Sequence, residues 1–218
     1  ERATDKIKMR QILQEKGVPV PQFRPVWTLD EGREAVNSME LPLVIKPCDN
    51  MGARGVRKIE RPDDLISAFR EAKEASISGK LVVEEFMEGP ELSLDALIYK
   101  DDIHITGIAD RIIEHSPYFV EVGHTLPSNL PGQQVKETIE VFKQAIRALG
   151  INTGAAKGDI KFTPEGPKIV EIAARLSGGW MSAYTYPLSS GVNLYKAAIQ
   201  VALGESPDDL KPKKSLVA

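Results

Sequence analysis

Two carboxylates in the last third of the chain are spaced so that they could share a divalent cation. Between them, a three-residue loop at 164–166 with glycine in the left-handed position predicts a β-hairpin. In that hairpin Thr163 faces Pro167, and Asp159 faces Glu171 with about 4.5–5.5 Å between their Cβ atoms. Opposed like charges destabilise a sheet unless a cation neutralises them, and oxygen ligands suit Mg²⁺. The pair therefore predicts a magnesium site. The alternative is an exposed face on which water solvates both carboxylates, but the apolar strand around Glu171 argues against it.

The loop Pro47–Gly55, between two predicted strands, has features of an anion-binding loop. Gly52 and Gly55 allow tight turns in which backbone N–H groups approach an anion closely. Lys46 at the end of the first strand and Arg54 within the loop add fixed positive charge. The loop is not a Walker motif, because the G-x-x-x-x-G-K-[ST] order is absent and a strand follows. The alternative is an ordinary hairpin loop with a solvated lysine.

Two further segments could contact a substrate. Arg175 stands just before the turn at 177–179, and a guanidinium beside two glycines can bind a carboxylate or phosphate oxygen. The same glycines equally fit a sharp bend. The segment Val82–Glu91 joins two predicted strands through a short connector, whose backbone could contact the edge of an adenine beside the apolar side chains of Phe86 and Met87.

Hydrophobic periodicity predicts a mixture of helices and strands that must position these residues. Helices are predicted at 5–16, 30–39, from Pro62 onward, 132–149 and 193–203. Strands are predicted at 22–27, 43–46, 56–59, 81–86, 91–99, 103–110, 118–125, 155–163 and 167–172. Since the late strands form hairpins, the pattern predicts an α+β fold with antiparallel sheets, each covered by helices on one side.

The composition narrows the class of protein. Of 218 residues, 42% are hydrophobic and 27% charged, which excludes a disordered, collagenous or coiled-coil architecture. The net charge of −3 gives no general attraction to nucleic acid, and the apolar runs are far shorter than the roughly 20 residues that span a membrane. Cys48 has no partner for an internal disulfide, so a cytoplasmic location is expected. Because the chain starts at Glu1 without an initiator methionine and stops abruptly at Ala218, we expect it to be part of a longer protein.

Taken in order along the chain, these motifs resemble those of the ATP-grasp superfamily, and the resemblance covers nearly the whole chain. Asp5-Lys6 followed by Gly17-Val18-Pro19 resembles the entry helix of that family, whose lysine reaches the nucleotide phosphates. The implied ATP-binding residues are Lys6, Lys46, Gly52, Arg54, Gly55, Glu84, Glu85, Phe86, Met87 and Glu91. Among them, the backbone at 84–87 would hold adenine and Glu91 would hold the ribose hydroxyls.

The segment 171–179 is similar to the Glu-Ile-Asn-x-Arg-x-Gly-Gly of the carboxylate–amine ligase branch, which includes biotin carboxylase, carbamoyl-phosphate synthetase and the amino-acid ligases. The resemblance implies that Asp159 and Glu171 bind Mg²⁺, for which Mn²⁺ can substitute. Ala173 departs from the pattern, because many members carry an asparagine there as a third metal ligand. This departure implies incomplete coordination of two metal ions.

The implied reaction is attack of a carboxylate on the γ-phosphate of Mg·ATP, followed by displacement of phosphate from the acyl phosphate by an amine. Lys46 and Arg175 are the implied catalytic residues, Lys46 on the phosphates and Arg175 orienting the acyl phosphate. In the ATP-grasp fold two α/β lobes with antiparallel sheets grip ATP. Residues 1–84, including the loop 47–55, would form the N-terminal lobe, and residues 85–218 the C-terminal lobe with the metal site.

The implied partners are a small-molecule carboxylate and an amine. A small N-terminal α/β domain of the family, which would be missing from this chain, would complete the acceptor pocket. A homodimer is compatible with the resemblance, whereas nucleic acid and membranes are not expected as partners. Two alternatives stay open: bicarbonate could be the phosphorylated acid, as in carboxylases and carbamoyl-phosphate synthesis, or Ala173 could mark a nucleotide-binding regulatory module without turnover. We also expect the loop 48–55 to be mobile without nucleotide.

Overall fold

The structure is a computed structural model that describes residues 2–213 and 215–217, and the chain divides into two compact units. Unit 1 comprises Glu1–Gln11, Val20–Met87 and Ile113–Val122, and unit 2 comprises Ile12–Pro19, Glu88–Ile112 and Gly123–Ala218. The expected lobes, 1–84 and 85–218, place a single boundary a few residues before Glu88. They differ from the observed division in the segments 12–19 and 113–122, so the chain passes between the units several times.

Hydrogen bonds account for the two segments that differ from the expected lobes. Segment 113–122 belongs to unit 1, where the carbonyl of Pro117 accepts from the N–H of Lys58 at 3.2 Å. Segment 12–19 belongs to unit 2, where its last carbonyl accepts from the N–H of Ile169 at 2.9 Å. A single boundary drawn along the sequence cannot represent such exchanges.

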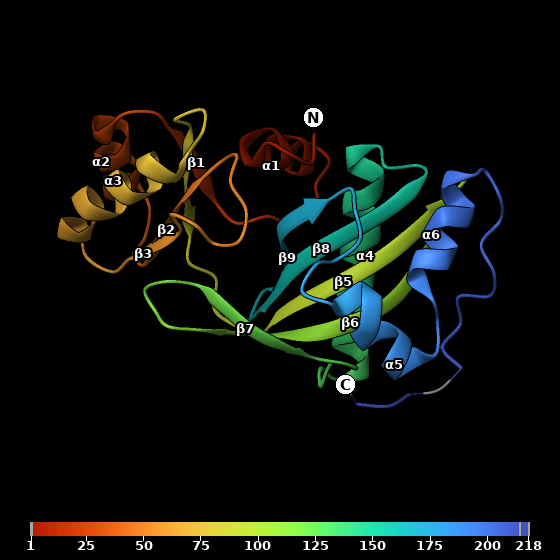
Figure 1. Cartoon of the computed structure of the whole chain (residues 1–218). Coiled ribbons are helices and arrows are strands. Elements are labelled where there is room, and N and C mark those ends of the chain that lie inside the picture. The colour runs from red at the N-terminus through yellow and green to blue at the C-terminus, as the bar shows by residue number, and fades with distance from the viewer. Residues whose placement is uncertain (1, 214, 218) are drawn as a thin grey trace. The chain divides into compact units, whose positions relative to one another are not determined.

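Unit 1 is built on a four-stranded antiparallel sheet with the order β1-β4-β2-β3 (Figure 1). Its strands are β1 (Phe23–Val26), β2 (Leu43–Pro47), β3 (Arg57–Ile59) and β4 (Leu81–Glu85). The helices are α1 (Lys6–Glu15), which begins in this unit, α2 (Leu29–Ser38) and α3 (Leu65–Ala75), the last preceded by a 3-10 turn at Pro62–Asp64. α2 begins at a capping box in which Thr28 and Glu31 exchange hydrogen bonds.

The two faces of this sheet differ in character. Leu43 and Ile45 of β2, with alternate residues of β4, pack against α2 and α3 in a hydrophobic core. Because side chains alternate along a strand, the intervening residues point to the opposite face. Lys46 and Glu84 are among them, so the strand period places two charged side chains on the face that α2 and α3 leave uncovered.

Unit 2 is built on a five-stranded sheet with the order β7-β6-β5-β8-β9, in which β5, β6, β8 and β9 pair antiparallel. The strands are β5 (Glu91–Tyr99), β6 (Asp102–Glu114), β7 (Val120–Thr125), β8 (Gly154–Thr163) and β9 (Gly166–Ala173). The end of β6 and the beginning of β7 lie in segment 113–122, which is assigned to unit 1. The helices are α4 (Gly132–Leu149), a π-helical turn at Met181–Thr185, α5 (Tyr186–Ser190) and α6 (Leu194–Ala202).

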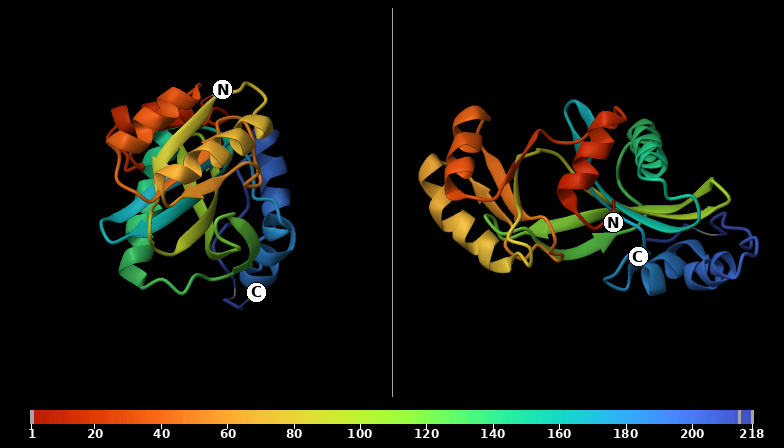
Figure 2. Two further views of the ribbon diagram at one scale, coloured as in Figure 1. Left: turned by 90° about the vertical axis from the view of Figure 1, so that its left-hand side faces the viewer. Right: turned by 90° about the horizontal axis from the view of Figure 1, so that it is seen from above.

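Helices cover both faces of this second sheet, so the expectation of helices on one side is wrong here. α4 lies on one face, and α5 and α6 lie on the other (Figure 2, right). On the α4 face, Phe142 packs so closely on Gly158 that a Cβ there would lie 2.5 Å from the ring. On the opposite face, Leu97 joins a core with Tyr186 and Leu194. α6 was predicted as a helix at 193–203, but not its place on this second face, and α5 is too short to show a helical period.

The other predicted helices and strands are present, with ends that differ by a few residues. The π-helical turn and α5 are the additions. Among the described residues, no helix combines the length and apolar character needed to cross a membrane.

Candidate functional site

Three charged side chains form a buried cluster between α1 and the sheet of unit 1. Arg10 Nε and Nη2 donate to the two carboxylate oxygens of Glu84 at 2.8 and 3.1 Å, and Lys46 Nζ lies 2.5 Å from Glu84 Oε2. Arg10 is fully buried, and Glu84 and Lys46 are 2% and 8% exposed. Since Lys46 pairs with Val82 in the ladder, Glu84 is its diagonal neighbour, within reach of a long side chain.

Burial and the neighbouring charges shift the pKa values of Glu84 and Lys46 in this cluster. Burial opposes ionisation of Glu84, but the Arg10 guanidinium and the Lys46 ammonium lower the pKa of its carboxyl to about 2. Burial lowers the pKa of Lys46, and the Glu84 carboxylate opposes that shift. An ammonium has three donors, so Lys46 can bind a second anion while Glu84 fixes its position.

Arg10 was missed by sequence reasoning, and so were the ion pairs of Glu84. Glu84 lies in β4, within the predicted strand 81–86, and its carboxylate is occupied by Arg10 and Lys46. The signal for Arg10 was its position three residues before Leu13, a spacing that puts both on the buried face of α1.

The rest of the predicted adenine-binding connector is partly engaged within unit 1. The N–H groups of Glu85 and Phe86 donate to backbone carbonyls at 3.0 and 3.1 Å, so a bound adenine would have to use other backbone atoms there. Lys58 Nζ lies 4.3 Å from the centre of the Phe86 ring, a cation–π contact, and Met87 is buried. The adenine role of this segment stays a prediction.

The glycine loop is anchored at both ends. The Asp49 carboxylate accepts from the hydroxyl or N–H groups of residues 76–78 at 2.5–3.2 Å. Gly55, at φ 72°, lies so close to α3 that a Cβ would come within 2.6 Å of the Cβ of Ala75. We therefore confine the expected mobility, first assigned to 48–55, to the exposed residues Met51–Arg54.

Lys6 reaches this loop from α1. Its Nζ donates to the carbonyl of Asn50 at 2.8 Å, and its charge contributes to the lowered pKa of Lys46. Arg54 Nε donates to a carbonyl of the same loop at 3.2 Å, and Gly52 has φ 70° with open space around it. Unit 1 thus gathers Lys6, Lys46 and the glycine loop, and their contacts with phosphate stay a prediction.

Cys48 is expected to be unreactive in the folded protein. Its thiol is buried beside the loop, and burial raises its pKa to about 12, which leaves almost no thiolate, the reactive form, near pH 8. Mass spectrometry after iodoacetamide treatment should show no adduct on the native protein and a single adduct in guanidinium. Rapid stoichiometric alkylation of the native protein would contradict the buried position.

Asp159 and Glu171 lie directly opposite each other in the β8–β9 hairpin, as predicted, but the turn of the hairpin differs from the predicted one. The hairpin has a two-residue turn, so Thr163 pairs with Gly166 rather than with Pro167. A β-bulge next to Asp159 then shifts the register by one residue and restores the predicted pair. The prediction of the pair was confirmed, and the prediction of the turn was wrong.

Asp159 is buried and carries two cationic partners. Its Oδ2 is ion-paired with Lys157 Nζ and lies 3.1 Å from Arg111 Nη1. Burial opposes ionisation, but these two cations hold the pKa of Asp159 below its ordinary value. Ser93 lies directly opposite on β5, and its side chain also lowers the pKa of Asp159. Among the described residues, buried Asp159 Oδ1 has no hydrogen-bond partner of good geometry, and a cation is one group that could satisfy it.

Glu91 belongs to the same group of charged side chains as Asp159 and Arg111. It is ion-paired with Arg111, and Lys161 Nζ lies 3.7 Å from its Oε2. Sequence reasoning missed all three cations around these carboxylates. The signal for two of them was the period of two along β8, which puts Lys157, Asp159 and Lys161 on one face. The ribose role of Glu91 stays a prediction.

A second buried carboxylate tethers the segment after β9. Asp95 accepts from the Ser177 N–H at 3.1 Å, the Ser177 hydroxyl at 2.7 Å and the Ser182 hydroxyl at 2.5 Å. Burial raises the pKa of Asp95, although these hydrogen bonds oppose the shift. Arg175 lies at the start of the tethered segment, where it is exposed and its Nη1 donates to the Leu176 carbonyl at 3.0 Å.

Replacing Asp95 by alanine is expected to loosen this segment and to destabilise unit 2 by about 2–3 kcal/mol, because buried donors of Ser177 and Ser182 lose their acceptor. Hydrogen exchange of the Ser177 amide should become faster, and Ser182→Ala should have a smaller effect. The exposed Asp102 provides the control, Asp102→Ala. Unchanged protection of Ser177 in Asp95→Ala would show that the tether does not hold the segment.

The residues present fit one divalent cation. In residues 2–213 and 215–217, no group of three or more His, Cys, Asp or Glu side chains is placed to hold a metal ion. Mg²⁺ commonly binds through one or two carboxylates together with substrate phosphates and water. Asp159 and Glu171, with the open Oδ1 of Asp159, match that pattern.

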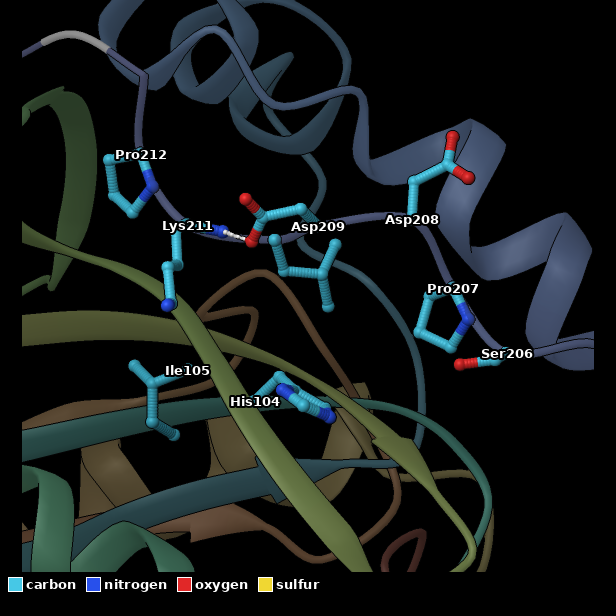
Figure 3. Close-up of a pocket in the computed structure, with 9 residues that line it drawn as sticks. His104, Ile105, Ser206, Pro207, Asp208, Asp209, Lys211 and Pro212 are labelled. Carbon is cyan, nitrogen blue, oxygen red and sulfur yellow. Dashed lines mark hydrogen bonds between the residues drawn. The ribbon is translucent and has the colours of Figure 1, made fainter.

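A cavity of about 380 Å³ lies elsewhere in unit 2, between β6 and the segment that follows α6 (Figure 3). In it, the N–H of Lys211 donates to Asp209 Oδ1 at 3.0 Å. Its lining residues are His104, Ile105, Ser206, Pro207, Asp208, Asp209, Leu210, Lys211 and Pro212. They include none of the predicted site residues, so we do not assign the site to this cavity.

Known proteins similar to this chain were found by sequence and by structure. The chain is 30% identical to the uncharacterized protein y4rH of Sinorhizobium fredii, over 94% of this chain and 43% of that protein. It is 26% identical to the carbamoyl phosphate synthase large chain of Rubrobacter xylanophilus, over 97% of this chain and 20% of that protein. The crystal structure of L-amino acid ligase from Bacillus licheniformis matches with a TM-score of 0.80 and 26% identity, over 98% of this chain and 49% of that chain.

The chain thus spans half or less of the length of each of these proteins. A family model described as ATP-grasp domain matches residues 39–184. This match includes β2 with Lys46, the glycine loop, the Asp159–Glu171 pair and Arg175. The chain belongs to the ATP-grasp family.

Proposed function

We propose that the chain is the ATP-binding domain of an ATP-dependent carboxylate–amine ligase that works through an acyl phosphate. The observation that carries this proposal is the directly opposed Asp159–Glu171 pair, with one buried carboxylate oxygen that lacks a hydrogen-bond partner of good geometry among the described residues, in a chain of the ATP-grasp family. The similarity to L-amino acid ligase supports the choice of reaction.

In the proposed reaction Lys46 and Lys6 bind the phosphates of ATP, and Asp159 and Glu171 hold Mg²⁺. A bound Mg²⁺ supplies charge neutralisation for the transferred phosphoryl group. Lys46 is held in position by Glu84, so its charge needs little reorganisation when the phosphate binds. Arg175, exposed at the start of the tethered segment, orients the acyl phosphate.

The exposed aromatic side chains that follow Arg175 in the chain favour an acid larger than bicarbonate. Trp180 and Tyr184 are 70% and 57% exposed, and their rings meet edge to face at 5.3 Å. Such aromatic surface can pack against the side chain of an amino acid. Tyr186 is fully buried against Gly107 and does not contribute. Bicarbonate remains the second candidate, supported by the similarity to carbamoyl phosphate synthase.

The test is an ADP-release screen of the whole natural protein against amino acids, bicarbonate and small amines, with Lys46→Ala as the inactive variant and Lys196→Ala, at an exposed lysine of α6, as the control. ADP release that requires both an amino acid and an amine is the expected result. Release with bicarbonate alone would replace the amino acid by the second candidate. ATP binding without ADP release for any pair would indicate a regulatory module.

A further inference from the structure

Lys157 occupies the place beside Asp159 where a further metal ligand could stand. It lies two residues before Asp159 on β8, so both side chains project from the same face of the sheet. In the ladder Lys157 pairs with Ala173 of β9, whereas Asp159 pairs with Glu171. The four positions therefore form a square on one face, with two carboxylates along one side and an ammonium and a methyl group along the other.

The ammonium is fixed in this square. Lys157 Nζ is ion-paired with Asp159 Oδ2, and the Lys157 side chain is only 14% exposed. The methyl group of Ala173 leaves room for the lysine stem, since directly opposed Cβ atoms lie only about 4.5–5.5 Å apart. Asp95 pairs with Lys157 on the other side, but both of its oxygens accept hydrogen bonds from Ser177 and Ser182.

A first divalent cation would find ligands here, and a second would not. Asp159 and Glu171 can share one ion together with phosphate oxygens. Apart from a carboxylate shared with the first ion, a second ion would find no protein ligand at the neighbouring pair, where Lys157 is positively charged and Ala173 has no ligand atom. The Arg111 guanidinium, 3.1 Å from Asp159 Oδ2, adds a second fixed positive charge.

We propose that Lys157 replaces a second divalent cation, so that the chain binds an ATP-like nucleotide with one metal ion and the Lys157 ammonium. This inference rests on the proposed function and names the charge arrangement of the same site. An ammonium on a strand supplies permanent charge and three donors, which suit the oxygens of a polyphosphate. The metal requirement of the site is then one ion per nucleotide.

The test counts Mn²⁺ ions bound per protein at saturating non-hydrolysable ATP, by electron paramagnetic resonance of free and bound Mn²⁺. The wild type is expected to bind one Mn²⁺ with each nucleotide. The double variant Lys157→Met with Ala173→Asn, which removes the ammonium and adds a ligand oxygen, is expected to bind two. Lys157→Met alone should weaken nucleotide binding about tenfold or more, the effect of losing a charge-assisted contact.

The charge-matched control is Lys196→Met, which removes an exposed lysine of α6 that pairs with Asp208. It should bind one Mn²⁺ with wild-type nucleotide affinity. Two Mn²⁺ ions in the wild type, or unchanged affinity in Lys157→Met, would overturn the role of Lys157 while leaving nucleotide binding in place. Absence of nucleotide binding in the wild type would overturn the proposed function, and this inference with it.

Discussion

Glu84→Gln is expected to destabilise unit 1 by about 3–5 kcal/mol, because it leaves the buried charges of Arg10 and Lys46 without their anion. The variant should melt at a lower temperature and unfold at a lower denaturant concentration. Glu60→Gln is the matched control, since Glu60 is exposed and pairs only at the surface with Lys58. Equal stability of the two variants would mean that the cluster does not support the fold.

The difference in stability between wild type and Glu84→Gln is expected to depend on pH. The pKa of Glu84 is lowered from 4.5 to about 2, so its ionised form stabilises the fold fully above about pH 4.5. That contribution, on the order of 3 kcal/mol, is lost as the pH falls from about 4.5 toward 2. Wild type and Glu84→Gln should therefore converge in stability over this window. A constant difference from pH 6 to pH 2 would contradict the lowered pKa.

The second large effect is expected at the metal pair. Asp159→Asn and Glu171→Gln should each remove the metal-dependent part of nucleotide affinity, a loss of about tenfold to a hundredfold, because each takes an anionic ligand from the same ion. The double variant should lose little more than either single variant, since the shared ion is already gone. Calorimetric titration with Mg²⁺ and with EDTA separates the metal-dependent part.

Asp102→Asn serves as the control for this pair, because Asp102 is exposed at the start of β6. Fully additive losses for Asp159→Asn and Glu171→Gln would assign them two independent roles. Asp159→Asn is also expected to lower stability more than Glu171→Gln, since Asp159 neutralises both Lys157 and Arg111 in the absence of metal.

Strand and helix positions could be predicted from the sequence because their hydrophobic periods are long and regular. α4 shows the helical spacing over 18 residues, and its predicted bounds match the structure. α5, with five residues, shows no such period and was missed, whereas α6 was predicted as a helix but not the face of the sheet that it covers. The Asp159–Glu171 pair was predicted correctly although the predicted turn was wrong. The real turn is one residue shorter, and the β-bulge next to Asp159 shifts the register by one residue in compensation.

The partners of the charged residues could not be predicted in the same way. Alternation along β8 places Lys157 and Asp159 on one face, but it does not bring Arg111 of β6 to them, because that depends on the strand order of the sheet. Likewise, nothing local in β4 indicates that Glu84 meets Arg10 of α1, 74 positions away in the chain. Lys6 was grouped with Lys46 and the glycine loop only through the resemblance to the ATP-grasp superfamily, and in the structure Lys6 Nζ donates to the Asn50 carbonyl of that loop.

The most direct test of the central claim, that this chain binds Mg·ATP through Lys46 and the Asp159–Glu171 pair, is calorimetric titration with a non-hydrolysable ATP in the presence of Mg²⁺. We expect binding at one site, micromolar or weaker, reduced about tenfold or more by Lys46→Ala and by Glu171→Gln. Lys8→Ala, at an exposed lysine of α1, should leave the affinity unchanged. Absence of binding, or binding that neither Lys46→Ala nor Glu171→Gln weakens, would contradict the claim.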